Sequence, residues 1–349
     1  MASDWHNLNH ETLFAPAMEH RNDRRPVSSN AAAWAFLLFL TICLGLVELA
    51  DPVPITLRGI LPLTLSCGTL WGVAYYYRHI RPVEKFAEMC ISLSQVLLFS
   101  AVGIVLSYLA ARTNAPLWDE TFVRWDLALG FDWMAAMRLV DQSKVAVVVL
   151  YVAYGSLIPQ IVFLVCALGF MQKLEDLRTV MLAAMLCGAV CIFISAFMPA
   201  VAYPIHYGIT PTTFENVVPW AGFIKLGDFM SLRDGTIARL DFANMQGLIT
   251  FPSYHAGLSA VTFWGFYRTG INWLRLPGMT LAFLTIVSTP IDGGHYLVDV
   301  IAGIAVTIVA LFAARRMIRW DPHSRGLRHC HPAVHVKRLP GNISGLVGG

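Results

Sequence analysis

Eight apolar runs, separated by polar links, dominate the chain. They cover approximately residues 31–50, 57–77, 88–111, 145–171, 178–201, 253–268, 274–291 and 295–316. An α-helix needs about 20 apolar residues to cross the hydrocarbon core of a bilayer. The runs 253–268 and 274–291 are short for this purpose, and the second of them contains Pro277 and Pro290. The pattern predicts an all-α integral membrane protein with about eight transmembrane helices.

Two long polar or mixed segments, 112–144 and 202–252, interrupt the apolar runs. In the first of them, large apolar side chains recur at helical spacing: Trp118, Phe122, Trp125, Leu129 and Trp133. This spacing is typical of an amphipathic helix that lies along the membrane interface, where tryptophan is enriched. A loop that packs on the helical bundle is the alternative. For Asp126 and Asp132 in this segment, a polar head-group pocket and a solvated helix face are equally good interpretations.

The amino-acid composition also favours a membrane protein. Of the 349 residues, 56% are hydrophobic and 13% are Asp, Glu, Lys or Arg, whereas soluble domains carry roughly a quarter charged residues. The abundance of aliphatic and aromatic residues excludes a disordered chain. The formal net charge of +3 is too small to indicate nucleic acid binding. Most of the cysteines fall inside apolar runs, so no disulfide framework is expected.

The positions of the basic residues predict the topology. An even number of spans puts both termini on one side of the membrane, and most Lys and Arg residues flank the runs on that side. The positive-inside rule therefore predicts cytoplasmic termini. The segments 112–144 and 202–252, and the junction near 291–295, then face the periplasm or the exterior. An Ala- and Arg-rich chain without disulfides suits a bacterial inner membrane.

Two polar clusters, 251–257 and 292–299, lie at the predicted outer ends of the sixth and eighth runs. In the second cluster, His295 and Asp299 are four residues apart and share one helical face. A carboxylate bonded to one imidazole nitrogen fixes the tautomer and leaves the other nitrogen able to attack an electrophile. The pair therefore has the spacing of a primed nucleophile. A His–Asp pair that merely caps a helix end is the alternative.

The first cluster places Ser253 at the start of a predicted helix. A helix N-terminus presents unpaired N–H groups and the positive end of the helix dipole, and these bind phosphate. An N-cap is the ordinary role of a serine at this position. His255, two residues further on, has the chemistry of a general acid that protonates a leaving oxygen.

These residues resemble the motifs of the type 2 phosphatidic acid phosphatase superfamily. Residues 252–255, PSYH, are similar to its P-S-x-H motif, and His295 with Asp299 is similar to the H-x3-D end of its S-R-x5-H-x3-D motif. The resemblance covers roughly residues 88–316. Within the superfamily, FPSYHAG and GGHYLVDVIAG resemble most closely the branch of inositol phosphorylceramide synthases and their bacterial relatives.

The resemblance implies a role for each of four residues. His295 attacks phosphorus to form a phosphohistidine, and Asp299 orients His295 and stabilises its positive charge. His255 protonates the departing alkoxide, and Ser253 helps to hold the phosphate. In a second step, water or an alcohol attacks the phosphohistidine while His255 acts as base. Covalent catalysis of this kind needs neither a metal nor a cofactor.

The chain departs from the superfamily pattern in its basic residues. Ser288 matches the serine of S-R-x5-H-x3-D, but Thr289 stands in the arginine position, and no K-x6-R-P motif precedes the sixth run. Phosphate still needs cationic partners. The phosphate-binding candidates in the outer loop are Arg233, Lys225 and Arg239. For each of them, a solvated loop charge is the alternative.

The resemblance also implies an organisation in four parts. We expect a cytoplasmic N-terminal segment (1–30), two additional N-terminal spans (31–87), a six-helix phosphatase-like catalytic core (88–316) and a cytoplasmic tail (317–349).

The expected activity is that of a membrane lipid phosphotransferase, which moves a phospho-head-group between a lipid phosphate substrate and a polyol or other alcohol acceptor. One alternative is a lipid phosphate phosphatase that hydrolyses phosphatidic acid, phosphatidylglycerol phosphate or polyprenyl phosphates. Another is a transporter with a His/Asp proton relay, which predicts polar residues at mid-membrane depth in several spans. The ionisable residues of this chain crowd at the span ends instead, which favours an enzyme.

Overall fold

The computed structural model describes residues 30–319 except for 51, 53, 57, 225, 237 and 238. The described residues belong to one unit, Asn30–Arg319. The predicted cytoplasmic ends, 1–30 and 317–349, therefore lie almost wholly outside the described residues.

Each of the predicted apolar runs is helical in the structure. The longer helices are α1 (Ala31–Ala50), α2 (Ile60–Tyr75), α3 (Glu84–Ala111), α6 (Lys144–Gly155), α7 (Leu157–Phe170), α8 (Leu174–Ser195), α12 (Tyr254–Thr269), α13 (Asn272–Asp292) and α14 (Leu297–Arg319). A π-helical turn, η1 (Tyr76–Ile80), continues α2.

Length and apolarity qualify five helices of the described chain as membrane spans: α1, α3, α8, α13 and α14. A sixth candidate is the pair α6 and α7, which are bent by 55° at their junction. The structure thus confirms an all-α membrane protein, with five or six candidate spans where the sequence predicts about eight. The difference lies in the bent pair and in α2 and α12, which have 16 residues each and are therefore about 24 Å long.

α13 runs unbroken through its two prolines. Prolines are tolerated in membrane helices when neighbouring side chains satisfy the backbone groups that they leave unpaired. Near Pro290, polar side chains bond to neighbouring carbonyl groups of α13. The hydroxyls of Ser288 and Thr289 donate to the Thr285 carbonyl, and Nε1 of Trp133 donates to the Pro290 carbonyl at 2.8 Å. The seventh predicted run is therefore one continuous helix.

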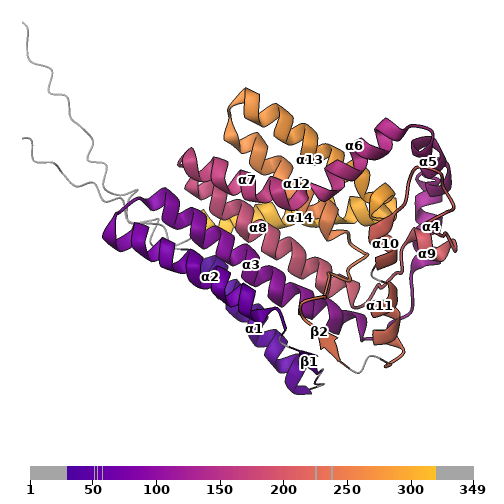
Figure 1. Ribbon diagram of the computed structural model, residues 1–349, viewed down its shortest axis with the longest axis horizontal. Coiled ribbons are helices and arrows are strands. Elements are labelled where there is room, and N and C mark those ends of the chain that lie inside the picture. Colours follow the sequence, from indigo (N-terminus) through magenta and orange to yellow (C-terminus); the bar gives the residue numbers. More distant parts are fainter. Residues whose placement is uncertain are drawn as a thin grey trace, which may run out of the picture. The chain divides into compact units, whose positions relative to one another are not determined.

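α8 is the central helix of the bundle, although it carries none of the predicted site residues. α3, α12 and α14 pack against α8, and 72% of its most apolar stretch is buried. α12 also packs on α13, and α13 packs on α6. α1 and α2 pack against α3, and Figure 1 shows these two N-terminal helices along the α3 side of the bundle.

The polar segments form short helices that gather at one end of the bundle, on the right of Figure 1. They are α4 (Asp119–Ala128), α5 (Trp133–Asp141), α9 (Tyr203–His206), α10 (Trp220–Ile224) and α11 (Leu226–Arg233). Two strands, β1 (Ile55–Thr56) and β2 (Leu240–Asp241), pair in parallel. This pairing joins the connection between α1 and α2 to the loop that leads into α12.

The helical spacing predicted for segment 112–144 is confirmed, but the segment forms two helices rather than one. Gly130, with a φ of 79°, separates α4 from α5. Phe122 and Trp133 are almost fully buried. Their rings stack on Phe251 and Tyr203, with centroids 4.5 and 5.1 Å apart. The segment therefore packs on the end of the bundle, beside the loop that precedes α12.

Candidate active site

Ser253 is the N-cap of α12. Its Oγ accepts a hydrogen bond from the backbone N–H of Ala256 at 3.3 Å, and its side chain is fully buried. Serine is favoured at an N-cap because its hydroxyl satisfies an N–H group that has no partner in the first helical turn. The cap fixes the start of α12, where His255 occupies the first turn.

The start of α12 packs directly on α14, and this contact brings the two motifs together. The backbone N–H of Ser253 donates to the Asp299 carbonyl at 3.0 Å, and Oγ1 of Thr307 donates to the Gly257 carbonyl at 2.8 Å. Gly303 permits the close approach, because a Cβ there would lie 2.2 Å from the Ser253 carbonyl oxygen. Sequence reasoning missed Gly303, although it stands one helical turn after Asp299 on the same face.

His295 and Asp299 form the pair that their spacing predicts. Nδ1 of His295 lies 3.1 Å from Oδ2 of Asp299, and the same oxygen accepts the backbone N–H of Tyr296 at 3.0 Å. Asp299 is fully buried and His295 is 5% exposed. His295 precedes the first residue of α14, so the pair joins a loop residue to the first helical turn. The carboxylate orients the imidazole.

His255 stacks face to face on Tyr154, with ring centroids 4.0 Å apart and ring planes inclined by 9°. Tyr154 stands near the end of α6, just before the bend into α7. His255, Tyr154 and His295 line one cavity of about 340 Å³. The rest of its lining is largely apolar and includes Leu157, Ile158, Ile249 and Leu258. Two imidazoles from separate motifs therefore share one cavity.

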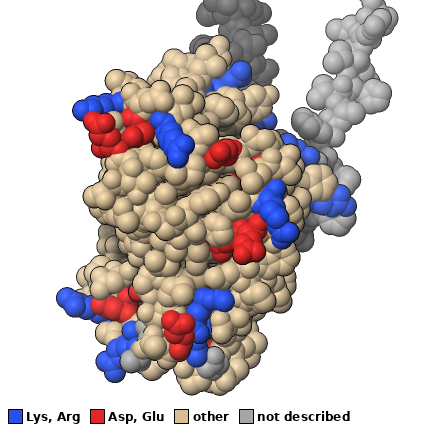
Figure 2. Space-filling view, turned by 90° about the vertical axis from the view of Figure 1, so that its right-hand side faces the viewer, with Lys and Arg blue, Asp and Glu red and all other residues tan. Residues whose placement is uncertain are grey.

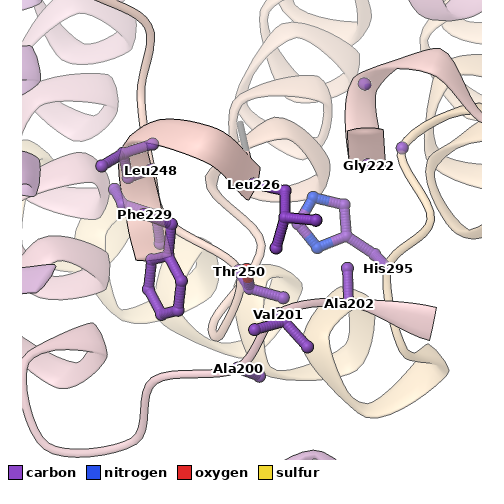
Figure 3. A pocket seen from close by; sticks show the side chains of 12 residues that line it. Ala200, Val201, Ala202, Gly222, Leu226, Phe229, Leu248, Thr250 and His295 are labelled. Atoms are coloured by element: carbon purple, nitrogen blue, oxygen red, sulfur yellow. The ribbon is translucent and has the colours of Figure 1, made fainter. Parts of the chain in front are cut away.

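His295 also borders a second cavity of about 20 Å³, which is roughly the room that one water molecule needs. Figure 3 shows the His295 ring beside Leu226 of α11, with Phe229 and Leu248 on the other side of this cavity and Thr250 between them. The segment that leads into α12 therefore covers His295 on this side.

Asp126 of α4 caps the N-terminus of α14. Its carboxylate accepts the backbone N–H groups of Leu297 and Val298 at 2.7 and 2.9 Å, and the hydroxyl of Tyr203 at 2.8 Å. Burial raises the pKa of Asp126 above its ordinary value, and these three hydrogen bonds oppose the rise. Asp126 is thus a buried helix cap rather than part of a solvated face, and Asp132 is the N-cap of α5.

Asp119, also from α4, fixes the backbone on the other side of the site. Its carboxylate accepts the backbone N–H groups of Val201 and Ala202 and, at 2.6 Å, the hydroxyl of Tyr296. Burial and the adjacent carboxylates raise the pKa of Tyr296, so its hydroxyl keeps its proton and donates. Because Tyr296 directly follows His295, α4 anchors the backbone on which the His–Asp pair is built.

Arg233, the first of the basic candidates, ends α11. Its Nη2 donates to the Ala115 carbonyl at 2.8 Å, and its guanidinium carbon lies 5.5 Å from the centre of the Phe229 ring. Burial lowers the pKa of Arg233, and the charges of Asp234 and Asp119 oppose that change. α11 reaches the site, since Phe229 lines the small cavity beside the His–Asp pair.

The other two basic candidates are Arg239 and Lys225. Arg239 is exposed directly before β2, and Lys225 lies outside the described residues. Neither Arg233 nor Arg239 is among the described residues that line the two cavities beside His295. On the face seen in Figure 2, Lys and Arg lie beside Asp and Glu in small mixed groups separated by uncharged surface. The phosphate-binding roles of these residues stay a prediction.

The fold and the site together define a class, a helical membrane protein in which a buried His–Asp pair and a second histidine share a cavity. The family model of the PAP2 superfamily matches residues 120–313, which is more than half of the chain. The chain belongs to the PAP2 superfamily and is a membrane lipid enzyme of the phosphatase and phosphotransferase type. No curated protein and no solved structure matches it. The family match begins in α4, ends in α14 and includes both motifs.

Proposed function

We propose that the protein moves a phospho-head-group from a lipid to an alcohol through a phosphohistidine at His295. The observation that carries this proposal is that His295, paired with Asp299, lines the same cavity as His255. An imidazole oriented by a carboxylate suits a nucleophile, and a second imidazole in the same cavity suits an acid and base. The resemblance of both motifs to those of inositol phosphorylceramide synthases favours transfer to an alcohol.

In the first step, Nε2 of His295 attacks phosphorus, and the bond between phosphorus and the lipid alkoxide oxygen breaks. His255, as imidazolium, gives its proton to that oxygen, so that a lipid alcohol leaves. Asp299 holds the Nδ1 proton of His295 and offsets the positive charge that the ring gains. No metal or cofactor takes part in this scheme.

In the second step, the hydroxyl oxygen of the acceptor attacks the phosphorus of the phosphohistidine. His255, now neutral, takes the hydroxyl proton while the bond between phosphorus and Nε2 breaks. His295 and His255 return to their starting protonation states. The head-group phosphate has then passed from one alcohol oxygen to another.

We propose that the phosphate oxygens meet the backbone N–H groups at the start of α12. Ser253 supports this position by capping the helix, because its Oγ accepts from Ala256. Positive charge would come from Arg233, Lys225 or Arg239, of which Arg233 is favoured because α11 also contributes to the cavity beside His295.

Hydrolysis is the second candidate function, and the water-sized cavity beside His295 favours it. In that case water replaces the alcohol in the second step, and inorganic or head-group phosphate is released. The substrates would be phosphatidic acid, phosphatidylglycerol phosphate or polyprenyl phosphates.

We also propose that the site faces the periplasm or exterior of a bacterial inner membrane and that both termini are cytoplasmic. Basic residues support this orientation, since they gather at the helix ends opposite the site. There, Lys173 donates to the carbonyls of Arg268 and Thr269, and Arg268 pairs with Asp176 at 2.8 Å. Such a concentration is typical of the cytoplasmic side.

A thin-layer assay of purified protein tests the proposed function. The substrate is a phospholipid labelled in its head-group phosphate, offered with and without a polyol acceptor. Transfer predicts a labelled product that appears only with the polyol, whereas hydrolysis predicts labelled water-soluble phosphate in both cases. Acid-labile label should remain on quenched wild-type protein.

His295→Ala should abolish both the turnover and the acid-labile label. The matched control is His206→Ala, because His206 is an exposed histidine at the end of α9. Full turnover by a folded His295→Ala protein contradicts the proposed mechanism.

A further inference from the structure

A further cavity, of about 100 Å³, lies inside the bundle between α3, α7, α8 and α12. These helices pack against one another and are neighbours in Figure 1. Most of the lining is apolar, with Phe99, Ile161, Met181 and Val261 as examples from the four helices. A lining of this kind suits the hydrocarbon chain of a lipid.

This cavity adjoins the cavity of the two histidines, because Ile158, Tyr254 and Leu258 line both. Tyr254 directly precedes the histidine of the first motif, and its ring centroid lies 6.3 Å from that of Phe99. Along α3, Gln95 stands one turn further from the site end of the bundle than Phe99, a rise of about 6 Å. The cavity therefore extends from Tyr254, beside the histidine of the first motif, toward Gln95 over about one helical turn of α3.

Gln95 is the polar residue that distinguishes this lining. Its side chain is 1% exposed, and its Nε2 has no hydrogen-bond partner among the described residues. A buried donor without an acceptor is unfavourable. In Gln160 of α7, another buried glutamine, Nε2 donates to the hydroxyls of Ser156 and Thr285 at 2.8 and 2.9 Å, and Oε1 is the atom without a partner among the described residues. The unpaired amide of Gln95 indicates an acceptor that a ligand brings.

We propose that this cavity binds a hydrophobic chain of the lipid substrate and that Nε2 of Gln95 donates to the carbonyl oxygen of the chain's ester or amide linkage. The inference rests on the proposed function and narrows its substrate to acyl lipids. An acyl lipid carries a carbonyl a few bonds from its phosphate. A polyprenyl chain carries no oxygen and leaves Gln95 unpaired.

Two phosphatidic acids that differ only in linkage provide the test: a diacyl lipid, and its dialkyl ether analogue, which lacks the carbonyl groups. Binding to the purified full-length protein is measured from the rise in unfolding temperature over a lipid titration, which requires no turnover. Wild-type protein should bind the diacyl lipid about tenfold more tightly than the ether, the effect of one buried hydrogen bond. Gln95→Leu should bind both lipids with the weaker affinity.

Gln160→Leu is the matched control and should keep the preference for the diacyl lipid. Because Nε2 of Gln95 has no partner among the described residues, Gln95→Leu should unfold without lipid at the wild-type temperature or above it. Gln160→Leu should unfold earlier, because it loses the two hydrogen bonds that Nε2 of Gln160 donates. A second variant, Ala184→Phe, fills the cavity from α8 and should weaken binding of long-chain diacyl lipids more than that of dioctanoyl lipid.

Equal binding of the two lipids by wild-type protein, or a preference that survives in Gln95→Leu, overturns this inference. Turnover of labelled lipid, measured in parallel, separates it from the proposed function. Turnover of labelled lipid without a preference for the diacyl over the dialkyl lipid refutes only the proposed binding of the acyl chain. A preference that depends on Gln95, without turnover of any lipid phosphate, refutes the proposed function alone.

Discussion

Replacing Gly303 by alanine tests whether the contact between α12 and α14 sets the separation of the two histidines. The new Cβ would lie 2.2 Å from the Ser253 carbonyl oxygen, whereas even a tight Cβ contact is 3.0–3.4 Å. The neighbouring atom belongs to the backbone, so it cannot turn away as a side chain can. The helices must therefore separate by about 1 Å, and a misplacement of that size between reacting groups costs about 10²-fold in rate.

The assay is steady-state turnover of a labelled lipid phosphate by Gly303→Ala, with thermal unfolding recorded on the same preparation. Two other glycines serve as controls. A Cβ at Gly278 would lie 2.3 Å from the Phe266 ring, while a Cβ at Gly72 would have nothing within 4 Å. Gly278→Ala should lose stability, by about 1–3 kcal/mol as overpacking usually costs, yet keep its turnover number. Gly72→Ala should keep its turnover and lose no stability, because alanine is more favourable than glycine inside a helix.

The comparison of Gly303→Ala with Gly278→Ala separates displacement of the histidines from general disruption of the bundle. If folded Gly303→Ala turns substrate over at the wild-type rate, the close contact does not position the histidines. If Gly278→Ala loses as much turnover as Gly303→Ala, the loss reports general disruption of the bundle rather than displacement at the site.

Two other variants test the residues that support the site. Asp126→Asn places an amide N–H₂ group among the three donors that Asp126 now accepts from, so the free energy of unfolding should fall by about 1–3 kcal/mol and turnover should fall with it. Asp132→Asn is the control and should change little, because asparagine is an equally good N-cap. Wild-type stability and turnover in Asp126→Asn would contradict the capping role. Tyr154→Leu removes the ring stacked on His255 and should lower turnover about tenfold. Tyr154→Phe keeps the stack and should restore the wild-type turnover, and equal turnover in all three proteins would show that the stack does not position His255.

The features that the sequence predicted correctly are those that depend on neighbours along the chain. Apolar runs predict helices, and the spacing of His295 and Asp299 predicts their contact, because both are local patterns. The roles of Asp126 and Tyr154 could not be predicted in this way. Asp126 meets Leu297 across 171 positions of sequence, and only the packing of α4 on the end of the bundle makes that hydrogen bond. The sequence alone therefore does not decide between a head-group pocket and a solvated face for Asp126.

The family match contains the residues of the proposed phosphate chemistry but not the residues of α3 that line the proposed chain-binding cavity. The match begins at residue 120 and contains Asp126, His255 and the His–Asp pair, so the proposed phosphate chemistry lies inside it. Gln95 and Phe99 stand on α3, ahead of the match, yet they line the cavity that adjoins the cavity of the two histidines. Chemistry shared across a family needs constant geometry around phosphorus, whereas recognition of the chain can differ from member to member. We therefore expect substitutions on the cavity face of α3 to change which lipid is bound while leaving formation of the phosphohistidine intact. In Gln95→Leu, the phosphohistidine yields from diacyl and dialkyl substrates measure both the lipid preference and the formation of the intermediate.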